Sequence, residues 1–400
     1  MRISTSMLND SAVNGIMQDE AALSQTQNEL STGKSVNTPA DNPVAAVQLL
    51  QLNNTNSQYQ QYISNGQSAN TNLTLEEQAL SSSTTTLQSI RDLVVQANSS
   101  SNNSSDLQNI ATEISALEQQ LLGTANSQNA QGEYLFAGYS TGTQPFVRGS
   151  SGSMAYVGDS GASSVPLNSG TSVQTGDAGS TVYMNIPTGN GTFTTAASSG
   201  NTGTGVIDTG SVTNQSAWVS GHYTITFTDA SDYTVTDATG ATVASGTYNS
   251  SNGGEIAFDG IQVGITGAPA AGDSFKVSSS ATQSVFSTLD NLVSSLNNAG
   301  SSPAARAQLS SALGGSLQQI DQALNQVSNV TTNVGSRISL ISSVNNSLTS
   351  ASTTVTTQIS NLSDLNYAAA TSQYSQEYVA LQAAEQSYAD INQLSLFKYL

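Results

Sequence analysis

An unbroken heptad seam runs through the C-terminal part of the chain. Its positions alternate at spacings of four and three residues: Leu313, Leu317, Ile320, Leu324, Val327, Thr331, Val334, Ile338, Ile341, Asn345, Leu348, Ser352, Val355, Ile359 and Leu362. A pattern sustained over this length predicts one helix of roughly 70–80 Å, at about 1.5 Å per residue. Because such a helix is longer than an ordinary domain is wide, it must lie against other long helices, as in a rod.

The charge of the chain limits its partners. Eight basic residues are scattered singly among 27 acidic ones, which gives a net charge of −19 over 400 residues. Without a basic patch, the chain is not expected to bind nucleic acid or an anionic membrane. Copies of the chain repel one another, so any assembly has to depend on apolar seams.

Cysteine is absent from the sequence, which excludes disulfides, thiolate metal sites and thiol nucleophiles. No run of residues approaches 18 apolar side chains, and residues 1–30 lack the apolar core of a secretory signal. We therefore expect no membrane insertion and, if the protein leaves the cell, no cleaved signal peptide.

Proline and glycine divide the chain into three parts. Residues 44–144 and 304–400 contain no proline, whereas 24 of the 33 glycines fall between Gly138 and Gly272. The pairs Asn42-Pro43 and Ser302-Pro303 each place a capping side chain before a proline, so they predict the starts of two long helices. The pattern thus indicates helical flanks around a glycine-rich middle.

The N-terminal flank carries a weaker seam. Apolar residues recur every seventh position from Ala45 to Val94, but the interleaved positions Asn70, Glu77, Thr84 and Arg91 are polar. After a Ser/Asn-rich turn at 98–105, a stripe from Leu107 to Leu121 predicts another helix that folds back antiparallel.

Both chain ends carry unfinished apolar stripes. The residues that we expect to face an assembly partner or a chaperone lie on these stripes or just beyond them: Leu23, Leu30, Tyr367, Tyr374, Leu381, Tyr388, Ile391, Leu394, Phe397 and Leu400. Neither stripe has a packing partner in its own flank, and each could serve as the packing partner of the other. The helix after residue 363 is poor in charge, so an intermolecular role is favoured over an ordinary intramolecular core for its tyrosines.

The middle of the chain alternates like short strands. Tyr223, Ile225 and Phe227 alternate with threonines, and 256–258 and 261–265 follow the same pattern. The fold class is therefore α+β multidomain, with a long antiparallel coiled-coil rod from both terminal regions and an inserted small all-β domain. The expected parts are an N-terminal segment (1–40), the N-terminal helical part of the rod (41–138), the inserted β domain (139–280), the C-terminal helical part of the rod (281–362) and a C-terminal assembly helix (363–400).

Residues of the middle that might carry chemistry have simpler explanations. His222 is the only histidine, and Asp229, Asp232 and Asp237 straddle a turn without a regular calcium loop. Gly203 and Gly205 do not continue into a nucleotide-binding pattern, and Trp218 suits a β-domain core. We expect no catalytic, metal or cofactor site, and no enzyme activity.

Several motifs in order resemble one family. They are Met1–Thr5, Leu30–Lys34 with Pro39 and Asp41–Pro43, Tyr134–Gly138, and Ser395–Leu400, supported by Arg91–Leu93, Gln96–Asn98 and Val334–Arg337. Together they resemble the flagellar hook-associated protein 3 family, the hook-filament junction proteins of bacterial flagella. Ser35, Asn42 and Lys398 depart from the usual family residues, which affects local contacts but not the helical pattern. The β insertion, with Gly272–Phe275, is similar to outer domains of hook-associated proteins.

The resemblance implies a structural adaptor without cofactors. It would form a ring of its own copies between the first hook-associated protein and the flagellin filament. It would be exported through the flagellar type III apparatus, with residues 1–40 as the export and assembly segment. A chaperone would hold its C-terminal assembly helix, 363–400. Both termini, disordered in the free monomer, would fold when a neighbour covers their stripes.

Two other functions remain open. A flagellin shares the plan of two helical ends, although the motifs Leu30–Lys34 and Ser395–Leu400 argue against it. A secreted glycan-binding or hydrolytic protein would act through the β domain, for example with Asp229 and Asp259, but their spacing does not mark an acid and a nucleophile.

Overall fold

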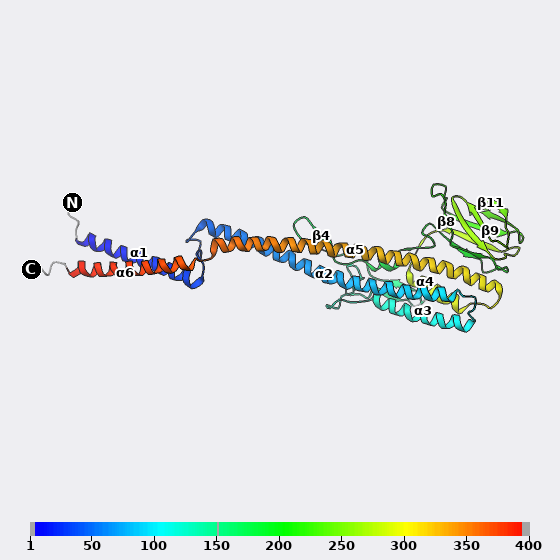
Figure 1. Cartoon of the computed structure of the whole chain (residues 1–400), viewed down its shortest axis with the longest axis horizontal. Helices are drawn as coiled ribbons and strands as arrows, with labels where there is room; N and C mark the ends of the chain where they lie inside the picture. The colour runs from blue at the N-terminus through cyan, green and yellow to red at the C-terminus, as the bar shows by residue number, and fades with distance from the viewer. Residues whose placement is uncertain (1–4, 150–151, 394–400) are drawn as a thin grey trace, which may run out of the picture. The chain divides into compact units, whose positions relative to one another are not determined.

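The computed structural model describes residues 5–149 and 152–393, and the chain divides into two compact units (Figure 1). One unit contains the described residues up to Asn65 and from Ser343 onward, and the other spans Gly66–Ser342. The α-helices are α1 (Thr5–Thr32), α2 (Pro43–Ala97), α3 (Ser104–Ala125), α4 (Val285–Asn297), α5 (Pro303–Ser363) and α6 (Tyr367–Gln393). Two of them, α2 and α5, contribute residues to both units. Among the described residues, no helix is both long and apolar enough to cross a membrane.

The two predicted helix starts are confirmed. The side-chain oxygen of Asn42 accepts a hydrogen bond from the Ala45 amide at 3.0 Å, and the Ser302 hydroxyl accepts one from the Ala305 amide at 3.2 Å. In each case proline occupies the first helical position, where its missing N–H leaves no bond unmade. Helix α5 then continues without interruption for 61 residues.

The heptad seam of α5 is confirmed as its packing face. Every second seam position from Leu313 to Val355 is buried, and Ser352 is buried as well: Leu313, Ile320, Val327, Val334, Ile341, Leu348, Ser352 and Val355. Helix α2 runs antiparallel to α5, because Arg91 pairs with Asp321 at 2.7 Å while Asn98 accepts a hydrogen bond from Ser310 at 2.9 Å.

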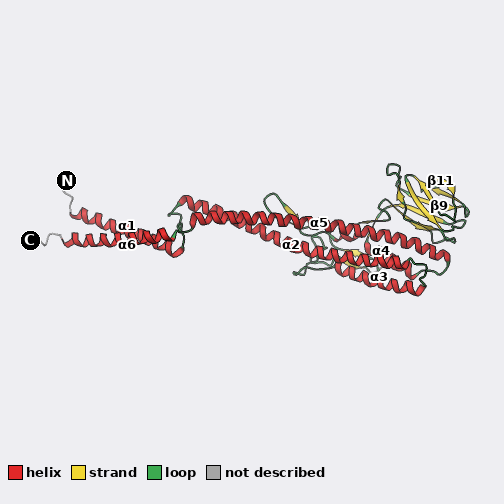
Figure 2. Cartoon of the chain, viewed as in Figure 1, coloured by secondary structure: helices red, strands yellow, loops and turns green. Residues whose placement is uncertain are grey.

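Helix α3 folds back on α2 as predicted. The Asn103 side chain accepts a hydrogen bond from the Asp106 amide, and the Asn103 amide donates to the Asp106 carboxylate at 3.0 Å, so the two residues form a capping box. The side-chain amide of Gln120 in α3 donates a hydrogen bond to the Thr86 hydroxyl of α2 at 3.4 Å. The end of α3 therefore lies beside an earlier part of α2. Helix α4 packs on α3 (Figure 2).

The β core occupies a smaller range than the expected insertion at 139–280. It begins at Phe193, and the segment before it packs on the helices instead. This segment forms β1 (Phe146–Arg148) with β2 (Met154–Tyr156), β3 (Ser164–Pro166) with β4 (Ser172–Gln174), the π-helical turn η1 (Ser180–Met184), and β5 (Ile186–Pro187) with β15 (Thr282–Gln283). Its aromatic rings form a cluster against the helices. The ring centroid of Tyr183 lies 5.5 Å from those of Phe136 and Phe146. The ring centroid of Phe146 lies 5.4 Å from that of Phe286 in α4.

Two antiparallel sheets form the β core. The first has the order β11 (Thr242–Thr247), β10 (Asp232–Thr236), β9 (His222–Phe227), β14 (Ser274–Ser279), β6 (Phe193–Ala197). The second has the order β12 (Gly254–Phe258), β13 (Ile261–Thr266), β7 (Val206–Ile207), and β8 (Ser211–Val212) also pairs with β13. As the alternation predicts, Tyr223, Ile225 and Phe227 of β9 point into the shared core.

The predicted fold class is confirmed. Long antiparallel helices come from both terminal regions, and an all-β domain is inserted between them. The expected disorder of the termini in a free monomer stays a prediction.

Candidate assembly surface

The two terminal helices pack on each other. Helix α1 lies antiparallel to α6, because the Leu365 amide donates to the Gly33 carbonyl at 2.9 Å while Thr26 donates to Glu377 at 2.7 Å. The predicted stripe residues Leu23, Leu30, Tyr374, Leu381 and Tyr388 are half-buried in this pair. The structure therefore brings together the two stripes that the sequence left without partners.

This helix pair has very little core. Among the described side chains of α1 and α6, only Thr26 and Ala370 are buried. A two-helix pair with such a small buried area cannot offset the conformational entropy lost on folding. Further apolar contacts are needed to hold it.

A short bridge closes the pair at the end of α1. Lys34 and Asp364 form an isolated antiparallel β-bridge, and the Ser35 amide donates to the Ser363 carbonyl at 2.7 Å. Gly33 has a φ of +70°, and a Cβ there would lie 2.8 Å from the Tyr367 hydroxyl. The turn in the Leu30–Lys34 motif therefore depends on glycine.

The next motif, Asp41–Pro43, forms the turn before α2. The amides of Thr38 and Asn37 donate to the Asp41 carboxylate at 2.7 and 2.9 Å, and these bonds lower the pKa of Asp41. Asn42, the next residue, caps the helix.

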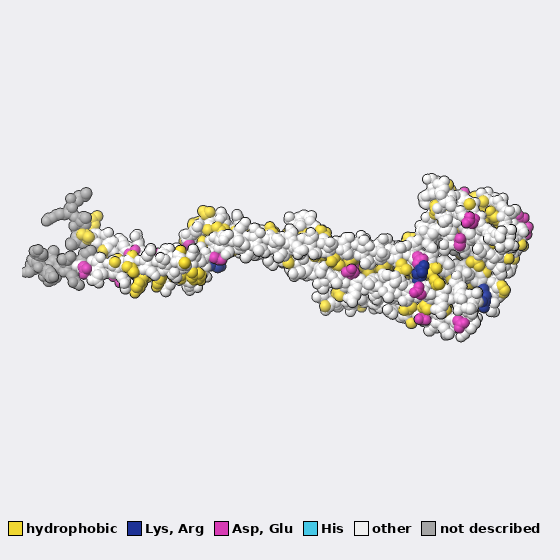
Figure 3. Space-filling view, viewed as in Figure 1, with side chains coloured by type: hydrophobic (Ala, Val, Ile, Leu, Met, Phe, Trp, Pro, Cys, Tyr) yellow, Lys and Arg dark blue, Asp and Glu magenta, His cyan; other side chains and the backbone are white. Residues whose placement is uncertain are grey.

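Large apolar side chains remain exposed around these elements (Figure 3). They belong to α1, to the first turns of α2 and to α6: Met7, Leu8, Val13, Met17, Val44, Val47, Leu50, Tyr367, Tyr378 and Val379. The predicted residue Tyr367 is 55% exposed, and Tyr374 stacks on Tyr378 with ring centroids 6.5 Å apart. The side chain of Ile391, and Leu394, Phe397 and Leu400, lie outside what the structure describes.

Sequence reasoning missed most of this exposed set. Tyr378, Val379 and Leu50 do not fall on the seven-residue seams, and a search for seams passes over apolar residues between them. For Leu50, the signal that could have found it is an apolar residue off the seam in a region without charge.

The first turns of α2 and the last turns of α5 share one further property. Pro43–Asn65 and Ser343–Ser363 contain no charged residue, in a chain with a net charge of −19. The two stretches lie side by side, because Ser352 donates to Asn56 at 2.7 Å and accepts from Gln60 at 3.0 Å. We call this helix pair, Pro43–Asn65 with Ser343–Ser363, the uncharged belt.

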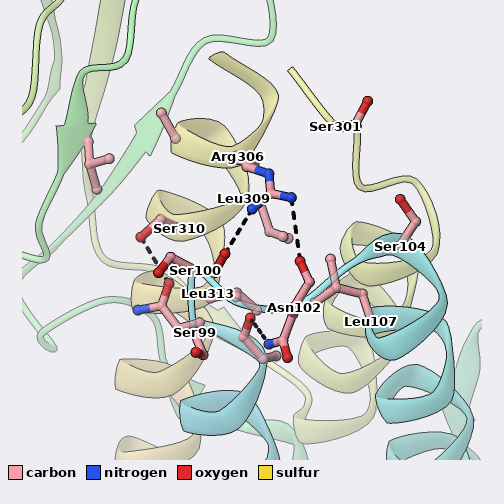
Figure 4. A pocket seen from close by; sticks show the side chains of 15 residues that line it. Ser99, Ser100, Asn102, Ser104, Leu107, Ser301, Arg306, Leu309, Ser310 and Leu313 are labelled. Atoms are coloured by element: carbon pink, nitrogen blue, oxygen red, sulfur yellow. Dashed lines mark hydrogen bonds between the residues drawn. The ribbon is translucent and has the colours of Figure 1, made fainter. Parts of the chain in front are cut away.

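A pocket of about 260 Å³ lies in the other unit, where the α2–α3 loop meets α5 (Figure 4). Arg306 is the only charged residue among its described lining, and it donates to the carbonyls of Ser100 at 3.0 Å and Asn102 at 3.5 Å. The guanidinium therefore joins the α2–α3 loop to the start of α5. Both of these hydrogen bonds of Arg306 thus have a structural role.

The β-domain residues that were considered for chemistry are placed as structural groups. His222 is exposed and contacts Ser278 at 3.0 Å. Asp229 and Asp237 accept hydrogen bonds from nearby amides of their own turns. Trp218 packs on the β core near Phe193. Within the described residues, no group of three or more His, Asp or Glu side chains could hold a metal ion.

Three family models match separate parts of the chain. The bacterial flagellin N-terminal helical region matches residues 3–141, and the bacterial flagellin C-terminal helical region matches residues 317–400. The D2-like domain of flagellar hook-associated protein 1 matches residues 196–279, which is the β core. Paired helices from both ends around such a domain define the class of flagellin-like proteins.

Individual relatives show which family of flagellin-like proteins the chain resembles. FlgL from Xanthomonas campestris is 35% identical in a crystal structure that covers 76% of this chain and 97% of that chain, with a TM-score of 0.71. The flagellar junction protein FlgL from Legionella pneumophila is 31% identical, with coverage of 78% and 100% and a TM-score of 0.72. Flagellar hook-associated protein 3 of Salmonella typhimurium is 32% identical over 183 residues, 46% of this chain. The chain belongs to the flagellar hook-associated protein 3 (FlgL) family.

The match to the curated relative is partial. It spans 57% of that protein's length. The similarity to the two FlgL structures extends over nearly their whole length.

Proposed function

We propose that this protein is a structural subunit of the bacterial flagellum that joins the hook to the flagellin filament. Membership of the FlgL family supports the flagellar role, and one relative is described as a flagellar junction protein. The protein acts by packing its terminal helices against neighbouring subunits. We infer no enzyme activity and no cofactor.

The uncharged belt is the observation that carries this proposal. Two strongly acidic chains repel each other, and that repulsion is weakest where both surfaces lack charge. Val44, Val47 and Leu50 on the belt are 57–69% exposed, so contact with a neighbour would remove apolar surface from water. An uncharged surface suits a neighbour that is also uncharged, such as another copy of the same helices.

The α1–α6 pair supports the same reading. Since it buries only two residues among those described, we expect it to be stable only when neighbouring subunits cover it. The predicted assembly residues Leu23, Leu30, Tyr374 and Leu381 would then be completed by contacts between subunits. This dependence would keep copies from polymerising early.

The partners that we propose are the first hook-associated protein, flagellin and further copies in a ring. Before assembly, a flagellar export chaperone would hold the C-terminal helix, and the type III apparatus would carry the chain out without a cleaved signal peptide. The location would be extracellular, at the hook-filament junction.

Charge placed in the belt tests the proposal. In a strain that depends on this protein for motility, Val47→Lys combined with Leu50→Lys should leave secreted flagellin unattached and reduce swimming at least tenfold. Both side chains are exposed, so the free protein should still fold. Val243→Lys, on an exposed residue of β11, is the matched control and should swim normally. Normal filaments on the double variant would contradict the proposal.

A further inference from the structure

One carboxyl group of α2 is buried in the packing face of the helices. Glu76 is 1% exposed and lies between the buried residues Leu73 and Leu80 on the same helix. Its Oε1 accepts a hydrogen bond from the Asp177 amide at 3.1 Å. Its Oε2 is buried without a hydrogen-bond partner in the part of the chain that the structure describes. A buried carboxylate with one oxygen unpaired is costly, so the neutral acid is the form that suits this place.

Asp177 connects this carboxyl to a second helix. It lies in the loop between β4 and η1, and Arg337 of α5 binds its carboxylate through two hydrogen bonds of 2.8 and 3.1 Å. The Asp177 and Arg337 side chains are 15% and 20% exposed. The loop is therefore held to α2 by its amide and to α5 by its side chain.

The charges around Glu76 do not balance its own. Two carboxyl groups share one guanidinium, and Arg337 directs both of its hydrogen bonds at Asp177. Burial and the negative charge of Asp177 raise the pKa of Glu76 to about 8, and the hydrogen bond from the Asp177 amide and the charge of Arg337 oppose this shift only in part. Tyr183 also faces the group, but burial raises the pKa of its hydroxyl, which shares a hydrogen bond with Ser83 and stays neutral. The neighbouring Glu77 is exposed.

We propose that Glu76, Asp177 and Arg337 form a pH-sensitive clasp, which holds the β4–η1 loop against α2 and α5 while Glu76 is protonated and loosens when Glu76 ionises. The clasp lies wholly within the unit Gly66–Ser342 and does not depend on the assembly role. The loop leads directly into η1, whose Tyr183 belongs to the aromatic cluster, so its attachment affects how the segment before the β core sits on the helices.

The direction of the pH effect follows from proton binding. In the unfolded chain the Glu76 carboxyl titrates near its ordinary value of 4.5, and in the folded chain it titrates near 8. Between these values the folded state holds the extra proton. The contribution of this group to stability is therefore complete below pH 4.5, declines as the pH rises, and is lost above about pH 8.

A carboxyl-carbon NMR titration of the full-length protein labelled with ¹³C-glutamate tests the clasp. We expect one Cδ resonance with a titration midpoint near pH 8, whereas an ordinary glutamate has its midpoint at about pH 4.3. That resonance should be missing from Glu76→Gln and present in Glu77→Gln, which makes the same change at the exposed neighbour. If every glutamate resonance of the wild type titrates below pH 6, or if the high one survives in Glu76→Gln, the proposal is overturned.

Amide hydrogen exchange then tests the opening of the loop. Above pH 8 the protection of the Asp177 amide, corrected for the intrinsic exchange rate, should fall by up to about tenfold per pH unit in the wild type. In Glu76→Gln it should stay level, because the neutral amide cannot ionise, and Glu77→Gln should behave like the wild type. Equal protection profiles in the wild type and Glu76→Gln would show that ionisation of Glu76 does not release the loop.

Discussion

Single hydroxyls and carboxyls connect the segment before the β core to the helices. Ser83 of α2 donates to its own helix at the Ala79 carbonyl (2.9 Å) and also contacts the buried Tyr183 hydroxyl at 2.8 Å. Arg148 of β1 joins Glu118 of α3 to Asp290 of α4. Each bond ends on a different element, so these residues fix where the segment lies.

Removing the buried Tyr183 hydroxyl should cost a moderate amount of stability. Tyr183→Phe keeps the ring in the aromatic cluster but leaves the Ser83 hydroxyl without this partner, so we expect the free energy of unfolding to fall by about 0.5–1.5 kcal/mol. Urea denaturation of the full chain measures the change. Tyr139→Phe, at a residue that is 68% exposed, is the control and should stay within about 0.5 kcal/mol of the wild type. An equal effect of the two variants would argue against a role for the buried bond.

Elements with a sustained period could be predicted from the sequence. The seam from Leu313 to Leu362 and the caps at Asn42 and Ser302 gave the long helices, because each feature depends only on local spacing. The short strands β1–β5 could not be placed, since they have two or three residues each. In β1, Phe146 packs on Phe286 of the distant helix α4, a contact that local spacing does not reveal. Exposed apolar residues on the seams, such as Tyr367, could be named from the sequence, whereas those beside the seams, such as Leu50, could not. The assembly role of these residues stays a prediction.

A matched pair of leucines on α5 tests the seam. Leu313→Ala removes a side chain that is 1% exposed and should destabilise the protein by about 2–5 kcal/mol, because it loses apolar burial and leaves a cavity. Leu340→Ala makes the same change off the seam, at 41% exposure, and should cost less than about 1 kcal/mol. Thermal and urea unfolding of both variants give the comparison. Similar losses would mean that the seam is not the main packing face.

At the scale of the whole molecule, the surface that we propose for assembly and the β core come from different parts of the sequence. The terminal helices and the uncharged belt carry the exposed apolar residues that suit subunit contacts. The β core is inserted through two chain segments that meet, because the Thr188 amide donates to the Ala281 carbonyl at 2.8 Å. The β core also contacts α5, because the Ile207 amide donates to the Ser311 hydroxyl at 3.2 Å. Its surface offers a specific target for an antibody.

Immunogold electron microscopy of isolated flagella, with antibody against residues 193–279, tests the central claim most directly. A junction subunit should give one band of label where the hook meets the filament, and none beyond it. Label along the entire filament would identify a flagellin subunit instead. A complete lack of label on flagella that carry filaments would contradict a flagellar role and favour a separate function of the β domain.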